Sequence, residues 1–102
     1  MNKLKNKLRI AIQSKGRLNQ SSLDFLASLG LKFTPKGRKL VVPCDNLDLD
    51  LLYLRSEDIP EYVSRGTADF GIVGENLLYE KKPKVKKLRK LGFGECKLII
   101  AV

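Results

Sequence analysis

The chain has 102 residues, enough for at most one small domain, and its hydrophobic fraction of 43% supports a real core. Twenty Lys and Arg against 11 Asp and Glu give a formal charge of +9, which suits nucleic acid, phosphorylated metabolites or an acidic membrane face. Histidine is absent and the two cysteines have no partners at metal-ligand spacing. This excludes His-based triads, most catalytic zinc sites and a disulfide framework. No stretch approaches transmembrane length, so we expect a cytoplasmic protein with no membrane partner.

The amino-terminal third predicts a strand, a polar loop and a helix. Residues 1–7 carry three lysines and are expected to be frayed. The apolar run at 8–13 predicts a buried strand, and a polar loop with one glycine and two cations follows it. A helix is expected from about Asn19 or Gln20 to Leu29, closed by Gly30 as a left-handed cap. This order is typical of anion sites, because backbone N–H groups and the helix dipole favour negative charge. An ordinary solvated turn is the alternative.

The middle of the chain predicts two strands and a second helix. Residues 39–44 form a short strand, in which Pro43 indicates an edge position or a strand end. Residues 49–55 form a mostly apolar strand. Acidic residues and Pro60 then mark the start of a helix that ends at Gly66.

The last third contains two strands and a cationic segment. Residues 67–73 predict a buried strand, and a short helix at 77–80 follows. Residues 81–90 hold seven Lys or Arg and are interpreted as a solvated charged face; a nucleic-acid stripe is the alternative, although no aromatic residue interrupts the run. An apolar strand at 97–102 ends without a cap, turn or polar tail, so we expect an incomplete domain.

Strands that alternate with helices predict an α/β protein with a mostly parallel sheet flanked by helices. Ligands of such sheets bind beyond the carboxyl ends of the strands, so the loops that leave these ends should meet at one rim. The loops expected there are 13–17, 55–58 and 74–76.

Several rim residues suit an oligophosphate. Lys15, Arg17 and Arg55 could share its charge, and Gly16 and Gly74 would let it approach the backbone; a set of unrelated surface charges is the alternative.

Three other polar residues have two interpretations each. Glu75 and Asn76 could hold a base or a ribose hydroxyl, or cap a helix. Asp69 lies at a helix-to-strand junction, where a carboxylate often caps a turn or pairs with an arginine.

Four segments in this order resemble the amino-terminal part of the catalytic region of ATP phosphoribosyltransferase, the first enzyme of histidine biosynthesis, in its long form. They are Leu-Arg-Ile-Ala-Ile-Gln-Ser-Lys-Gly-Arg-Leu (8–18), Leu-Arg-Ser-Glu-Asp-Ile-Pro-Glu-Tyr-Val (54–63), Ala-Asp-Phe-Gly-Ile-Val-Gly-Glu-Asn (68–76) and Leu-Gly-Phe-Gly-Glu-Cys-Lys-Leu (91–98).

The resemblance implies a fold, a reaction and a site. The fold is the first lobe of a type II periplasmic-binding-protein-like architecture. The reaction is displacement of pyrophosphate from C1 of phosphoribosyl pyrophosphate by N1 of ATP, with Mg²⁺ assisting, in an enzyme that forms a homo-oligomer when full-length. Asp69 is assigned a supporting role, and no catalytic residue or metal ligand is assigned. The substrate-binding positions are Gln13, Ser14, Lys15, Gly16, Arg17, Arg55, Gly74, Glu75 and Asn76.

The family's phosphoribosyl-pyrophosphate loop has no counterpart in these residues. We therefore expect residues 1–102 to be a single partial domain, inactive alone and inclined to self-associate through an exposed sheet edge. The alternative function is a non-enzymatic α/β ligand-binding module or a basic nucleic-acid-binding module.

Overall fold

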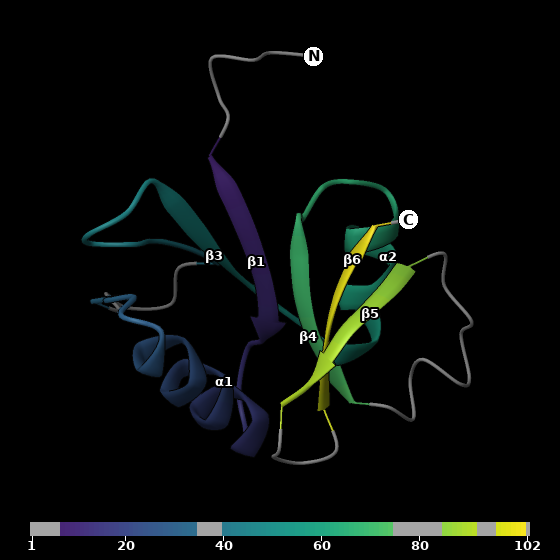
Figure 1. The fold of residues 1–102 in the computed structure, drawn as a ribbon, viewed down its shortest axis with the longest axis horizontal. Coiled ribbons are helices and arrows are strands. Elements are labelled where there is room, and N and C mark those ends of the chain that lie inside the picture. The colour runs from purple at the N-terminus through teal and green to yellow at the C-terminus, as the bar shows by residue number, and fades with distance from the viewer. Residues whose placement is uncertain (1–6, 35–39, 75–84, 92–95, 102) are drawn as a thin grey trace.

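The computed structural model describes residues 7–34, 40–74, 85–91 and 96–101, which form a six-stranded sheet with helices on both faces (Figure 1). The strand order is β2-β3-β1-β4-β6-β5. The strands are β1 (Leu8–Gln13), β2 (Val41–Pro43), β3 (Leu49–Leu54), β4 (Phe70–Gly74), β5 (Val85–Lys90) and β6 (Cys96–Ala101). The helices are α1 (Arg17–Ser28), the 3₁₀ helix η2 (Ser56–Asp58) and α2 (Ile59–Ser64).

The sheet is parallel at its centre and antiparallel at its sides. β1 pairs in parallel with β3 and β4, whereas β2, β6 and β5 each run antiparallel to a neighbour. The expected parallel sheet is therefore confined to three strands. The connections explain this, because α1 and α2 lie in the crossovers that parallel neighbours require, while only five residues separate β2 from β3 and β5 from β6 along the chain.

The two edge strands differ in how well the sequence predicts them. Pro43 correctly predicts that β2 lies at an edge. β5 was not predicted: residues 85–90, inside the segment interpreted as a solvated charged face, form a strand that pairs with β6, and Lys86 on it is exposed. Its sequence, VKKLRK, gave no strand signal because lysine is depleted in strands. Proline and clustered cations both discourage further strand pairing, which opposes the self-association expected through a sheet edge.

Each face of the sheet has its own apolar core, as the alternation along β1 requires. Ile10 and Ile12 face α1, and Ala11 between them faces α2. The α1 side also buries Leu26, Val42, Leu49, Leu51, Ile72 and Cys96, and the α2 side also buries Leu52, Ile59, Val63, Ala68, Val73 and Ile99.

Helix α2 packs directly on the backbone of β4, and Gly71 makes this possible. A Cβ atom at Gly71 would lie 2.7 Å from Cγ2 of Ile59 and 2.8 Å from Cγ2 of Val63. Because α2 lies this close, η2 before it is held over the same face of the sheet, next to the carboxyl end of β3.

Helix α1 begins two residues earlier than expected and ends as predicted. Gly30 has φ 93°, and its N–H donates to the carbonyl of Ala27 at 2.9 Å. The N–H of Leu31 donates to the carbonyl of Leu26 at 3.2 Å, which completes a Schellman motif. The left-handed cap predicted at Gly30 is therefore confirmed.

Candidate functional site

The carboxyl ends of the three parallel strands lie at one edge of the sheet, toward the bottom of Figure 1. Gln13, the last residue of β1, is in register with Leu54, the last residue of β3. The N–H of Ser14 donates to the carbonyl of Leu54 at 2.8 Å, which ties the loop after β1 to the end of β3. Ala11 pairs with Gly71, so the end of β4 is level with the end of β1. The loops that follow all three strands therefore begin at this edge, which we call the rim.

The loop between β1 and α1 is held by its own polar groups. The side-chain amide of Gln13 donates through Nε2 to the carbonyl of Lys15 at 2.8 Å. Asn19 donates through Nδ2 to the carbonyl of Gln13 at 2.9 Å, and its N–H reaches the carbonyl of Gly16 at 3.2 Å. Asn19, which the sequence placed only at the helix start, thus closes the loop. One hydrogen of the Gln13 side-chain amide is thus bound to the loop backbone.

Gly16 has a backbone conformation that essentially only glycine adopts, with φ 87° and ψ −170°. A Cβ atom at this position would also lie 3.3 Å from Nε2 of Gln13. The glycine therefore allows the backbone to turn sharply into α1 and leaves room for the hydrogen bond from the Gln13 side chain to the carbonyl of Lys15.

The amino terminus of α1 is open to an anion. Gly16 occupies the cap position, no side chain caps the helix, and its first turn contains no acidic residue. The N–H groups of Arg17 and Leu18 have no acceptor within the helix, and the helix dipole adds partial positive charge there. Lys15 and Arg17 are exposed, and within the described part of the chain their side chains form no hydrogen bond or ion pair. Two full charges and two backbone donors thus lie together at the rim.

Arg55 and Gly74 follow β3 and end β4 at the same edge. The Arg55 side chain is 75% exposed, and its Nε lies 3.3 Å from Oδ2 of Asp58. Exposed pairs of this kind contribute little, about 0–1 kcal/mol, so an anionic ligand could replace the carboxylate. Among the residues that the structure describes, none has an atom within 4 Å of a Cβ atom placed at Gly74. Glu75 and Asn76 lie outside the described residues.

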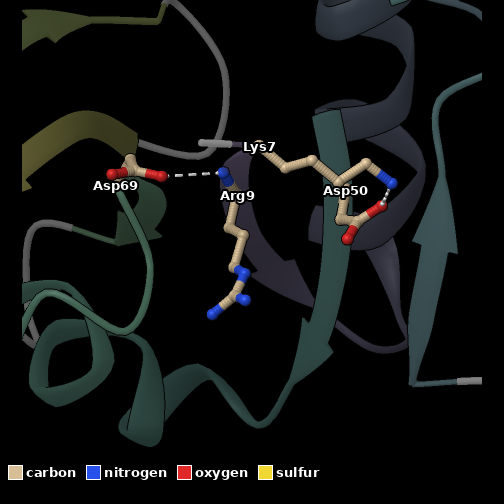
Figure 2. Close-up of polar contacts among 4 residues, drawn as sticks. All are labelled: Lys7, Arg9, Asp50 and Asp69. Atoms are coloured by element: carbon tan, nitrogen blue, oxygen red, sulfur yellow. Dashed lines mark hydrogen bonds and ion pairs between the residues drawn. The ribbon is translucent and has the colours of Figure 1, made fainter. Parts of the chain in front are cut away.

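Asp69 lies at the opposite end of β4 from the rim. Its Oδ2 accepts a hydrogen bond from the N–H of Arg9 at 2.9 Å (Figure 2). The N–H of Asp69 in turn donates to the carbonyl of Arg9 at 2.9 Å. The carboxylate thus binds the backbone of an arginine rather than its guanidinium. Nearby, Nζ of Lys7 lies 3.1 Å from Oδ1 of Asp50 on β3. Lys7, expected within the frayed terminus, is held by this contact.

Other features lie away from the rim loops or carry no ligand chemistry. A shallow hollow of about 450 Å³ begins at Asp58 in the loop after β3 and follows the outer side of α2, where Glu61 and Arg65 form an exposed ion pair at 2.6 Å. Cys96 is buried beside Gly74, and burial raises the pKa of its thiol. Among residues 7–34, 40–74, 85–91 and 96–101, no three His, Cys, Asp or Glu side chains cluster as metal ligands. No helix in these ranges is long and apolar enough to cross a membrane.

The fold and the rim define a class of protein: an α/β lobe that offers positive charge and backbone donors beyond the carboxyl ends of its parallel strands. Known proteins narrow this class. Residues 55–102 match the family described as "HisG: ATP phosphoribosyltransferase". ATP phosphoribosyltransferases of Cytophaga hutchinsonii and Phocaeicola vulgatus are 44% and 42% identical to the chain over 95 residues, which are 93% of the chain. The chain is thus similar to ATP phosphoribosyltransferases over nearly its whole length, which confirms the resemblance seen in its sequence.

A solved structure agrees with this similarity. The "ATP phosphoribosyl transferase (HisG:HisZ) complex from Thermotoga maritima" matches with a TM-score of 0.68 and 27% sequence identity, over 82% of this chain and 40% of that chain. The expected periplasmic-binding-protein-like fold is confirmed by this neighbour. The chain spans about a third of the length of the curated relatives it matches: 33% of the Cytophaga hutchinsonii protein and 34% of the Phocaeicola vulgatus protein.

Proposed function

We propose that this chain supplies the phosphate-binding rim of an ATP phosphoribosyltransferase, which transfers phosphoribosyl from phosphoribosyl pyrophosphate to N1 of ATP in the first step of histidine biosynthesis. The observation that carries the proposal is the uncapped start of α1, flanked by the exposed charges of Lys15 and Arg17, at the edge where β3 and β4 also end. A polyanionic substrate complements this combination.

In the proposed site, the residues of the rim divide into three roles. Lys15, Arg17 and Arg55 neutralise phosphate charge. Gly16 and Gly74 allow the ligand to approach the backbone closely. Gln13 and Ser14 line the rim, and Glu75 and Asn76, which lie outside the described residues, stay predicted substrate-binding positions.

The chemistry asks the protein for positioning and charge stabilisation. N1 of ATP forms a bond to C1 of the ribose while the bond from C1 to the pyrophosphate oxygen breaks, and pyrophosphate leaves with the electron pair. Cations and backbone donors aimed at the leaving phosphates lower the energy of this step. Mg²⁺ would assist by neutralising the same phosphates, since it is commonly bound by substrate phosphates with only one or two carboxylates. We place this reaction in the cytoplasm, in a homo-oligomer of the whole enzyme.

Calorimetric titration of ATP into the chain tests the proposal. We expect saturable binding that is lost in the double variant Lys15→Ala/Arg17→Ala. Binding should be retained in Lys86→Ala, which removes a positive charge from β5 instead of from the rim. Absence of ATP and phosphoribosyl pyrophosphate binding by the unmodified chain would contradict it.

The same samples distinguish the alternative of a basic nucleic-acid-binding module. Such a module would bind duplex DNA with a steep salt dependence and without competition by ATP, and Lys86→Ala would weaken it. The proposal predicts the opposite pattern. It also predicts that the 102-residue chain alone releases no pyrophosphate from the two substrates, whereas a family enzyme as long as the curated relatives does.

A further inference from the structure

A third strand brings a cation to the rim. β6 runs antiparallel to β4, so its first residues lie beside the last residues of β4: Cys96 pairs with Gly74, and Lys97 pairs with Val73. Lys97 therefore lies at the rim end of the sheet although it stands in a strand of opposite direction. This position could not be predicted, because Lys97 stands at the start of an apolar strand whose neighbours in the sheet the sequence does not show.

The register also fixes the face on which Lys97 lies. Residues two apart in a strand share a face, and Ile99 belongs to the apolar core under α2. Lys97 thus lies on the α2 face, closer to the rim than Ile99, and its side chain is half-buried. Ile99 is in register with Gly71, which α2 contacts through Ile59, so Lys97 lies between the start of α2 and the rim.

Lys97 and the loop after β1 approach the rim from opposite faces. α1 covers one face and α2 covers the other. β1 and β6 are separated only by β4, which puts their backbones about 10 Å apart. A lysine in this position can lay its four-carbon stem along the apolar surface and carry its charge to the edge of that surface.

We propose that Lys97 is a further phosphate-binding residue of the rim, which contacts the oligophosphate of a substrate from the α2 face while Lys15 and Arg17 contact it from the α1 face. This inference rests on the proposed function and adds a residue to its site. The oligophosphate belongs to ATP or to phosphoribosyl pyrophosphate, two sources of the same chemistry that separate titrations distinguish.

The test compares charge removal at the two ends of the same hairpin. Lys97→Met keeps the apolar stem and removes the charge, Lys97→Gln does so with a different shape, and Lys97→Arg keeps the charge. Lys86→Met is the matched control, because Lys86 is exposed on β5 and pairs with Ile100, toward the opposite end of the sheet. Each variant is titrated with ATP and with phosphoribosyl pyrophosphate, and its thermal midpoint confirms that it is folded.

We expect Lys97→Met and Lys97→Gln to weaken at least one of the two ligands about tenfold, which corresponds to about 1.4 kcal/mol. Lys97→Arg should retain most of the affinity, and Lys86→Met should change it less than twofold. Unchanged affinity for both ligands in Lys97→Met, or equal loss in Lys97→Arg, would overturn the inference while the proposed function stands. Failure of the unmodified chain to bind either ligand would overturn both.

Discussion

The two ends of the parallel strands use their polar groups in opposite ways. At the amino ends, Asp69 makes two hydrogen bonds with the backbone of Arg9, and Lys7 pairs with Asp50 (Figure 2). At the carboxyl ends, α1 begins without a side-chain cap, and the charges of Lys15 and Arg17 are exposed. One end thus binds its strands together, whereas the other leaves donors and charge for a ligand. The difference separates residues that stabilise the fold from residues that bind.

The largest effect is expected from the double variant Lys15→Ala/Arg17→Ala at the rim. ATP affinity should fall about a hundredfold, or about 2.7 kcal/mol, because charge-assisted hydrogen bonds to phosphate are lost. The free energy of unfolding should change by less than about 0.5 kcal/mol, as for other exposed substitutions. Titration calorimetry and urea unfolding measure the two quantities. If the free energy of unfolding fell as much as the free energy of ATP binding, the rim residues would stabilise the fold as those at the amino ends of the strands do, and the two ends would not differ.

Gly16→Ala should affect both binding and stability. The left-handed conformation at this position strains any other residue by about 1–3 kcal/mol, and the new methyl group would press on the Gln13 amide. Urea unfolding should show this loss, and ATP affinity should fall with it because the start of α1 moves. As a control, Gly74→Ala adds a methyl group that meets no atom of the described residues, so it should leave stability nearly unchanged and lower only the affinity for ATP. Equal behaviour of the two variants would argue against the proposed approach of a ligand to Gly74.

Asp69→Ala should lower the free energy of unfolding by about 1–2 kcal/mol, because the N–H of Arg9 loses a charged acceptor at a partly solvated site. ATP affinity should stay within twofold. Asp69→Asn keeps an acceptor oxygen and should recover part of the stability. A loss of ATP affinity in Asp69→Ala with unchanged stability would assign this carboxylate to the site instead of to the opposite end of the sheet.

The smallest effect is expected for Lys7→Met. The Lys7–Asp50 pair is partly exposed, at 38% for the lysine side chain, so it should contribute less than about 1 kcal/mol. Urea unfolding at low and high salt checks this, since added salt should reduce the difference between the variant and the unmodified chain. A loss above 2 kcal/mol would mean that the terminus contributes more than this ion pair.

The sequence predicted the local features of the rim and missed those that depend on long-range pairing. The apolar run before a glycine-containing cationic loop was enough to place β1 and to predict a helix after the loop, although α1 begins two residues earlier than expected, and Gly30 marked the end of α1. The position of Lys97 could not be predicted, because it follows from the antiparallel register of β6 against β4. β5 was missed because its cations obscure the strand pattern of an edge. The role of Asn19 in closing the loop could not be predicted, because it depends on the position of the Gln13 carbonyl in the folded chain.

The proposal that the rim binds the substrate phosphates is tested most directly by mapping the NMR chemical shifts of the backbone amides during an ATP titration. If the rim binds the phosphates, the largest shifts should fall on the loop from Ser14 to Arg17, on Arg55 and on Gly74, and inorganic pyrophosphate should reproduce many of them. The amides of Asp50 and Asp69 should hardly move. Saturable shifts concentrated around Asp50 and Asp69, with the loop after β1 unaffected, would contradict the account.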